Sequence, residues 1–107
     1  MGGGPLYPPA DVERLARAGK YWAPPGIVTK MTNRGVDAND KIVELLGSLS
    51  TAGRHHKRAK LEDGVNTADV YIVRSEEDGY EWYVKFYIDS DGEICVLSCK
   101  WHGAGIW

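Results

Sequence analysis

The chain has 107 residues, of which 43% are hydrophobic and 26% charged; this length and composition exclude a disordered chain and favour a single globular domain over residues 1–107. No apolar run approaches the roughly 18 residues of a membrane-spanning helix, so no membrane partner is expected. The net charge of −2 excludes an overall basic protein of the kind that binds nucleic acid over its whole surface. We predict a cytoplasmic protein.

The first half of the chain is predicted to be helical. Residues 1–6 lack the basic start and apolar run of a secretory signal and are interpreted as a flexible leader. A helix is predicted over residues 11–18, where apolar residues recur at helical spacing between two prolines and a glycine, and a shorter helix over residues 28–33. The clearest helix runs from about Ala38 to Ser48, with Asp37 as its N-cap. Its apolar stripe is interpreted as core packing and consists of Ile42, Leu45, Leu46 and Leu49.

A basic segment follows this helix and is the most unusual stretch of the sequence. Residues 1–61 hold ten Lys and Arg against five Asp and Glu, a charge of +5, whereas residues 62–107 hold three against ten, a charge of −7. The segment consists of Arg54, His55, His56, Lys57, Arg58, Ala59 and Lys60. If it is extended, alternation places His56, Arg58 and Lys60 on one face.

These residue types suit acid-base chemistry on a phosphodiester. The imidazole of histidine titrates near neutrality and can move protons, and cations offset the charge that develops on phosphoryl oxygens. The alternative is a solvated basic loop that binds nothing in particular. The sequence alone leaves both interpretations open.

The second half of the chain changes to the alternating pattern of strands. A short strand is predicted at Val70–Val73, and two longer ones at Tyr80–Ile88 and Glu93–Trp101, joined by a hairpin loop at Asp89–Gly92. We expect Ile88 to lie opposite Glu93. This register pairs Trp82 with Cys99, Val84 with Leu97 and Phe86 with Cys95, which gives one continuous apolar face.

The other face of the predicted hairpin is polar, and it is either a solvated surface or a site. The register places Glu81 opposite Lys100. The remaining residues of this face are Tyr83, Lys85, Tyr87, Ser98, Val96 and Ile94.

The two cysteines are predicted to be reduced core residues. Cys95 and Cys99 lie four apart in one strand, so their Cα atoms are about 13 Å apart, which is beyond disulfide reach. Reduced thiols suit a cytosolic protein. Neither a CxxC pair nor a matching His pair is present, so we expect no metal site, and no motif indicates a cofactor.

Five segments, in this order and with this spacing, are similar to those of one known family. They are Tyr7–Lys20, Ile42–Ser50, Asp69–Tyr71, Trp82–Lys85 and Ile94–Lys100. The first matches an opening helix that ends in a small residue, Gly and a polar residue. The second matches a helix that closes on a Leu, and from that Leu to the Asp-Val-Tyr the spacing is the same without a gap. The last two match a Val-Tyr-Leu-Lys strand and a closing Val-Leu-Ile-Val-Ser-Phe-Lys strand. The chain thus resembles the MqsR family of RelE-like RNA-cleaving toxins.

The resemblance implies both a fold and a function. The fold is α+β and RelE-like, with N-terminal helices over about residues 7–49 packed on a twisted antiparallel sheet over about residues 54–102. The function is that of a cytoplasmic toxin that cleaves messenger RNA and is neutralised by a cognate antitoxin protein. The ribosome is a further candidate partner.

The resemblance also implies site residues. The active-site Tyr of the family falls on Tyr83 and the Lys of its closing strand on Lys100. The Lys of its Asp-Phe-Tyr-Lys motif falls on His56, and the Gln before its Asp-Val-Tyr is Ala68 here. The aromatic Phe-Tyr pair of that motif is missing.

The reaction implied is metal-independent: the ribose 2′-OH attacks the adjacent phosphate and leaves a 2′,3′-cyclic end. His56 is the expected general base or acid, with His55 as its substitute, and Tyr83 orients the phosphate or passes a proton. The cations expected to bind RNA or stabilise phosphoryl charge are Arg54, Lys57, Arg58, Lys60, Lys85 and Lys100. The alternative is a non-catalytic module that binds RNA or a protein through the same fold.

Overall fold

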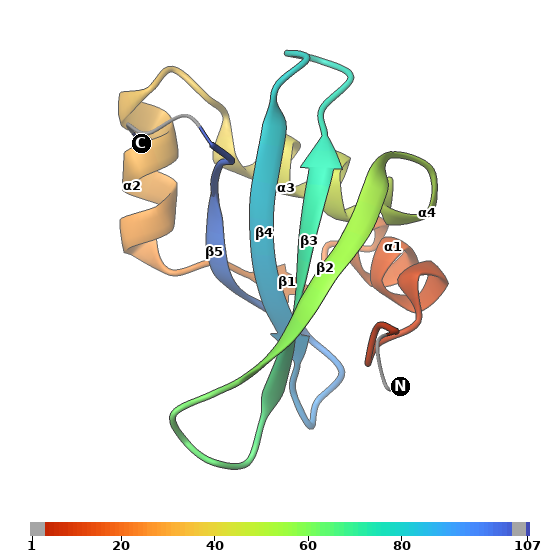
Figure 1. Cartoon of the computed structure of the whole chain (residues 1–107). Helices are drawn as coiled ribbons and strands as arrows, with labels where there is room; N and C mark the ends of the chain where they lie inside the picture. Colours follow the sequence, from red (N-terminus) through yellow and green to blue (C-terminus); the bar gives the residue numbers. More distant parts are fainter. Residues whose placement is uncertain (1–3, 104–106) are drawn as a thin grey trace.

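Four helices and five strands are present in the computed structural model, which describes residues 4–103 and 107. In chain order they are α1 (Pro9–Arg17), β1 (Tyr21–Trp22), α2 (Pro25–Asn33), α3 (Ala38–Leu46), α4 (Leu49–Ala52), β2 (Gly53–Lys60), β3 (Thr67–Arg74), β4 (Glu81–Ile88) and β5 (Ile94–Trp101). The strands form one sheet in the order β1-β5-β4-β3-β2 (Figure 1). The predicted α+β class is confirmed. No helix in the part of the chain described here is long and apolar enough to cross a membrane.

The sheet is mixed, so the prediction of a purely antiparallel sheet is wrong for one strand. β1 lies within the half that was predicted to be helical, and it pairs with β5 in parallel. Gly19, at a φ of 76°, turns the chain out of α1, and the Ile94 N–H donates to the Lys20 carbonyl oxygen at 3.0 Å. A strand of two residues is too short to show an alternating pattern, which is why the sequence did not reveal it.

Local capping explains where the main helix begins and ends. The Asp37 carboxylate accepts a hydrogen bond from the Asp40 N–H at 3.0 Å, so the predicted N-cap is confirmed. The helix ends at Leu46 rather than at Ser48. At Gly47 the chain passes so close to the preceding turn that an added Cβ would lie 2.6 Å from the Val43 carbonyl oxygen.

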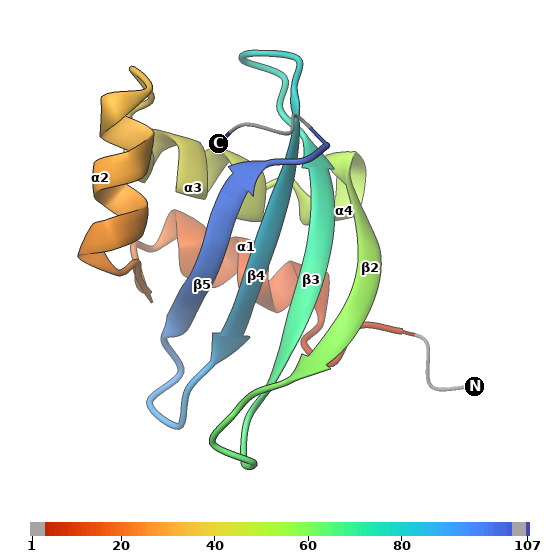
Figure 2. The ribbon, with the colours of Figure 1, turned by 60° about the vertical axis from the view of Figure 1, so that its left-hand side comes forward.

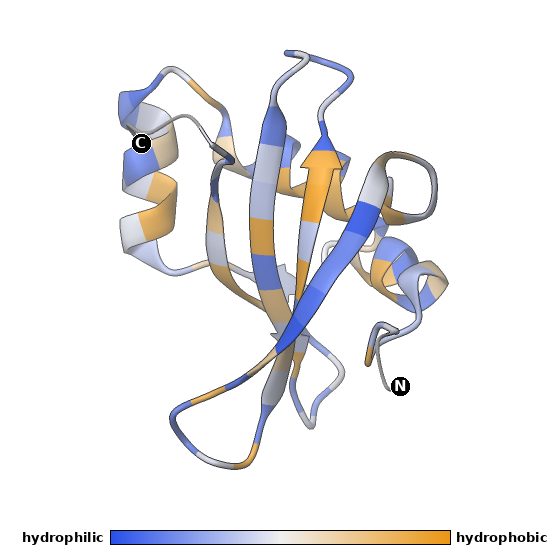
Figure 3. Cartoon of the chain, in the orientation of Figure 1, coloured by the Kyte–Doolittle hydropathy of each residue, from blue (hydrophilic) through white to orange (hydrophobic). Residues whose placement is uncertain are grey.

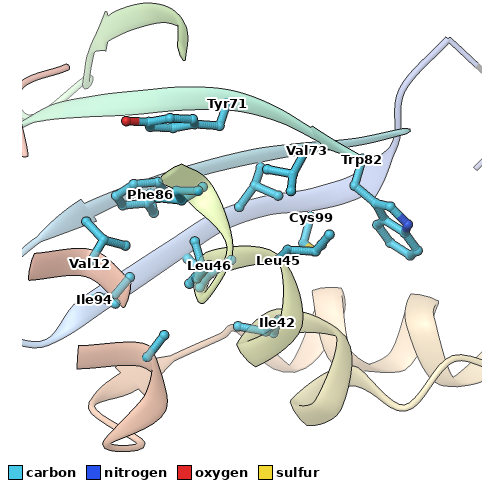
Figure 4. Packing of buried hydrophobic residues seen from close by; sticks show 14 of the residues in the cluster. Val12, Ile42, Leu45, Leu46, Tyr71, Val73, Trp82, Phe86, Ile94 and Cys99 are labelled. Carbon is cyan, nitrogen blue, oxygen red and sulfur yellow. The ribbon is translucent and has the colours of Figure 1, made fainter. Parts of the chain in front are cut away.

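The core lies between one face of the sheet and the helices, with α1, α3 and α4 on the same side (Figure 2). Figure 4 shows Tyr71 and Phe86 from the sheet above Leu46 of α3, and the two rings stack at 6.0 Å between centroids. Trp82 is fully buried, and its indole N–H donates to the Asp78 carboxylate at 3.2 Å. In the described part of the chain no helix covers the opposite face of the sheet, which is called the open face below.

The β4–β5 hairpin differs from the predicted register. Ile88 lies opposite Ile94 rather than opposite Glu93. The loop is longer than expected because the Asp89 N–H donates to the Glu93 carbonyl oxygen, and the Asp89 carboxylate accepts from the Glu93 N–H, both at 3.0 Å. The loop therefore holds residues 89–93.

A bulge in β5 shifts the register again. Lys85 pairs with Ser98 and Phe86 with Val96, which leaves Leu97 without a partner in β4. The residues of β5 that pack with the core are Ile94, Val96, Cys99 and Trp101. The predicted core face was right for Cys99 and wrong for Cys95 and Leu97. Both cysteines are free, as the sequence indicated.

Candidate functional site

The open face carries two rows of side chains that run across four strands. Residues directly opposite each other in neighbouring strands point to the same face. The first row consists of Arg54, Ile72, Tyr83 and Lys100. The second row consists of Lys57, Val70, Lys85 and Ser98. Both rows lie on the open face, because they alternate with Tyr71, Val84 and Cys99, which pack in the core.

Tyr83 and Lys100 are direct neighbours on this face. They are opposite each other in β4 and β5, so the prediction that they share one face is confirmed, whereas the predicted pairing of Lys100 with Glu81 is wrong. The Lys100 Nζ lies 5.2 Å from the centroid of the Tyr83 ring, within the range of a cation–π contact. The protein thus holds an ammonium group beside a phenol on an uncovered surface.

The open face is strongly cationic. The two rows carry the cations Arg54, Lys57, Lys85 and Lys100, and the next pair along the strands on the same face is Arg74 with the carboxylate of Glu81. The Arg54 Nη1 donates to the Glu81 Oε2 at 2.9 Å, and this bond holds the pKa of Glu81 below its ordinary value. Both partners are exposed, so the pair competes weakly with an incoming phosphate. Figure 3 shows β2 as a hydrophilic strand across the front of the sheet.

The floor between these cations is apolar. Val70 and Ile72 are fully buried although they point to the open face. The aliphatic stems of the long side chains on β2 and β4 flank them on both sides, which is how lysine and arginine cover apolar surface while their charges stay in water. The face therefore offers cations to a ligand, while Val70 and Ile72 stay covered beneath the neighbouring side chains.

A bulge in β2 separates the two histidines of the basic segment. His55 lies opposite Tyr71 and Lys57 opposite Val70, so His56 has no partner in β3 and is exposed at the bulge. Because the bulge adds one unpaired residue, the alternation of side chains between the two faces is shifted by one after His56. The predicted common face of His56, Arg58 and Lys60 is therefore wrong. Arg58 and Lys60 point to the helix side, whereas Arg54 and Lys57 point to the open face.

His55 is engaged on the helix side of the sheet. Its Nε2 lies 2.9 Å from the Asp69 Oδ1, and its ring meets the Tyr71 ring edge-on at 5.2 Å between centroids. Asp69 is fully buried and also accepts from the backbone N–H groups of Leu6 and Tyr7, both at 2.9 Å. His55 thus belongs to a bonded cluster that holds the start of the described chain.

The predicted flexible leader is only partly described. Its residues 1–3 lie outside the described part of the chain. Gly4 accepts a hydrogen bond from the Arg58 Nε at 2.9 Å, and Leu6 is bound by Asp69. Residues 4–6 are therefore hydrogen-bonded to β2 and β3, and the Arg58 side chain donates to the Gly4 carbonyl oxygen.

The Tyr71 phenol and the Cys99 thiol, both in the core, are unsuited to proton transfer. Burial, followed by the charges of Asp69 and Glu13, raises the pKa of Tyr71 to about 12. Burial raises the pKa of the Cys99 thiol to about 12, with Lys41 opposing it. Both groups stay protonated at neutral pH.

A concave region of about 640 Å³ lies beside the N-terminal part of α3, and most of its charged lining residues are acidic. At its base the buried Lys41 Nζ contacts the carboxylates of Glu44, Glu77 and Asp78 at 2.8, 2.6 and 3.1 Å and the Ser75 hydroxyl at 2.8 Å. Burial lowers the pKa of Lys41, but these bonds outweigh it and the net shift is upward. The remaining acidic residues of the lining repel phosphate, so this region is no site for RNA.

The residues predicted from the sequence therefore fall in three places. On the open face lie Arg54, Lys57, Tyr83, Lys85 and Lys100. His56 is exposed at the bulge on the edge of the sheet. On the helix side lie His55, Arg58 and Lys60.

Sequence reasoning missed two cations near the site. Arg74 lies on the open face opposite Glu81, and its spacing of two from Ile72 could have placed it there. Lys30 reaches the neighbourhood of Lys100 from α2, and no sequence signal links these distant positions. Comparisons of the chain with protein-family models, with curated proteins and with solved structures found no match.

Proposed function

We propose that the chain is a RelE-like ribonuclease toxin, resembling the MqsR family, that cleaves messenger RNA in the cytoplasm. The observation that carries the proposal is the pairing of Tyr83 with Lys100 on an uncovered cationic sheet face. These are the two positions that match the Tyr and Lys of the family. Arg54 lies in the same row, and Lys57 and Lys85 lie in the next, so phosphates of a strand laid on this face meet cations from three strands.

The proposed reaction is an internal transesterification. The ribose 2′ oxygen forms a bond to the adjacent phosphorus, and the bond from phosphorus to the 5′ oxygen breaks. A general base takes the 2′-OH proton and a general acid protonates the departing 5′ oxygen, which leaves a 2′,3′-cyclic phosphate and a 5′-hydroxyl. His56 transfers protons from the edge of the sheet. Tyr83 orients the phosphate, and Lys100 offsets the charge that develops on its oxygens.

The width of the sheet supports a substrate that lies across the strands. Neighbouring strands are about 4.8 Å apart, so the backbones of β2 and β5 are about 14 Å apart. Arg54 and Lys100 lie on the open face of these two strands, in the same row. On this proposal the side chains of His56 and Lys100 extend inward from the two sides and act on the one phosphate that Tyr83 orients.

The proposed partner is an antitoxin protein with an acidic contact surface. β2 is the last strand of the sheet and carries basic side chains on both faces. Charges of opposite sign steer association and fix the orientation of two proteins. An antitoxin on this strand covers His56 and so blocks cleavage. The ribosome is a further proposed partner through the same cations.

The competing function is a non-catalytic module that binds RNA or a protein. It is favoured by the position of His55, which is bonded to Asp69 on the helix side and leaves His56 as the one imidazole of the basic segment without such a bond. Binding needs the cations but no proton transfer. Cleavage assays separate the two functions.

Labelled RNA incubated with the purified protein is expected to be cleaved, and DNA of the same sequence is expected to stay intact. DNA lacks the 2′-OH nucleophile, and EDTA is expected to have no effect because every acting group proposed is a side chain. The products are identified by their 2′,3′-cyclic ends. Loss of cleavage in EDTA contradicts the mechanism. Intact RNA, with and without ribosomes, supports the binding module.

Tyr83→Phe and Lys100→Ala are each expected to slow RNA cleavage by about 10- to 100-fold, because each removes a donor to the phosphate. Both side chains lie on the open face, so thermal unfolding of the variants is expected to match that of the unmodified chain. The control is Lys20→Ala, which removes an exposed cation outside both rows. Equal rates for all of these proteins would remove the basis of the proposed site.

A further inference from the structure

A groove runs between α2 and β5 beside the open face. Its volume is about 420 Å³, within the range of about 300–1,000 Å³ found for small-molecule pockets. Figure 1 shows α2 standing next to the outer edge of β5. The apolar and aromatic part of the lining consists of Pro24, Ile27, Leu97 and Trp107.

The β5 wall of this groove is a strand edge. β1 pairs only with Ile94 and Cys95, and beyond Cys95 no strand among the described residues lies outside β5. The outward N–H and C=O groups of residues 97–101 are thus left without a strand partner. An open strand edge presents alternating donors and acceptors in a fixed direction. The edge of a planar heterocycle can bond to such groups.

Two cations stand at the mouth of the groove. Lys30 comes from α2 and Lys100 from β5, and Ser98 of β5 also lines the groove. Lys100 belongs both to this lining and to the row that contains Tyr83. Whatever fills the groove is therefore adjacent to a phosphate bound at Lys100. Apolar walls, a hydrogen-bonding edge and cations at the mouth together match the base and the phosphate of one nucleotide.

We propose that the α2–β5 groove holds the nucleobase next to the phosphate bound at Lys100, and that it selects which nucleotide occupies the site. The inference rests on the proposed RNA-binding function of the open face. The faces of the base pack against Ile27 and Leu97. Its edge bonds to the free backbone groups of β5, and Lys30 reaches the neighbouring phosphate.

Gly26→Phe tests the proposal. Gly26 lines the groove from the first turn of α2, and an added Cβ meets no atom within 4 Å, so a ring can be added beside the groove without a clash at the backbone. The ligands are 2′-O-methyl dinucleotides of each base, which cannot be cleaved, and the same sugar-phosphate without bases. The unmodified chain is expected to bind at least one base-containing dinucleotide about tenfold more tightly than the baseless one. Gly26→Phe is expected to abolish that preference.

The matched control is Thr29→Phe, which adds the same ring at an exposed position of α2 that does not line the groove, and it is expected to keep the preference. A second measurement uses the unmodified chain: nuclear magnetic resonance signals of the Ile27 methyl and Trp107 indole groups are expected to move with base-containing ligands and not with the baseless one. Equal binding of all ligands, or a preference that Gly26→Phe retains, overturns the proposal. Because these ligands cannot be cleaved, a base preference in a chain that fails to cleave RNA supports the groove and rejects only the ribonuclease function.

Discussion

Replacing His56 by alanine is expected to slow RNA cleavage by about 10²- to 10⁴-fold, the usual effect of removing a general acid or base. His56 is the one imidazole of the basic segment that is exposed, and it lies at the bulge on the edge of the sheet. The rate is measured with saturating labelled RNA, so that changes in binding do not enter. His56→Lys is expected to recover part of the rate if charge rather than proton transfer is what the position supplies.

The neighbouring histidine provides the matched control. His55→Ala removes the bond to the buried Asp69 carboxylate, so it is expected to lower stability while the folded protein keeps its cleavage rate. The free energy of unfolding is measured by urea denaturation beside the rate. A variant at His55 that is inactive but fully stable, together with an active variant at His56, would reverse the roles assigned to the two residues.

Lys41→Met is expected to lower the free energy of unfolding by about 1–3 kcal/mol at pH 7, because it removes a buried ammonium group and leaves the partly buried carboxylates of Glu44 and Asp78 without compensation. The Lys41 ammonium is buried and contacts three carboxylates, and Met keeps most of its apolar stem. The comparison is Lys57→Met, an exposed change expected to lie within about 0.5 kcal/mol of the unmodified chain. A similar small loss at Lys41 would show that solvent screens the cluster.

The pH dependence of this loss follows from the carboxylates. Burial alone raises the pKa of Glu44 and Asp78, but hydrogen bonds outweigh it, and both lie below their ordinary values. A group whose pKa is lowered by folding stabilises the protein above its unfolded pKa, and that stability is lost as the pH falls through the folded pKa. The difference between Lys41→Met and the unmodified chain is therefore expected to shrink below about pH 4. Urea denaturation from pH 3 to pH 7 measures it.

The sequence predicted a secondary-structure element correctly where the apolar residues followed a single periodicity. The stripe of Ile42, Leu45 and Leu46 predicted the main helix, and Asp37 predicted its cap, because both signals are local. The hairpin of β4 and β5 was also predicted from the loop at residues 89–92. Its register was not, because Ile94 and Cys95, like Val96 and Leu97, are apolar on both faces, so a shift by one residue changes nothing in the pattern.

The part of the candidate site that lies on the β4–β5 hairpin could be predicted from the sequence, whereas the part on β2 could not. Tyr83 and Lys100 were correctly predicted to share a face because each lies in a well-marked strand. At this point the observed register differs from the predicted one by two residues, and a shift by two leaves every side chain on the same face. The basic segment is polar on both faces, so no alternation could reveal the bulge at His56 or the burial of His55. The pairing of His55 with Asp69 joins residues of different strands and depends on the register itself.

The parallel pairing of β1 with β5 has a consequence for the order in which the chain folds. β2, β3, β4 and β5 are consecutive, and each pair closes a short loop, whereas Tyr21 meets Ile94 across the whole meander. Contacts between distant parts of a chain cost more closure entropy and form more slowly. The four-stranded meander with its cationic face can therefore assemble first, and the two residues of β1 then clamp the start of α2 beside β5. The groove at that edge exists only after this last step, so a nascent or locally opened chain can present the charged surface before it can discriminate between bases.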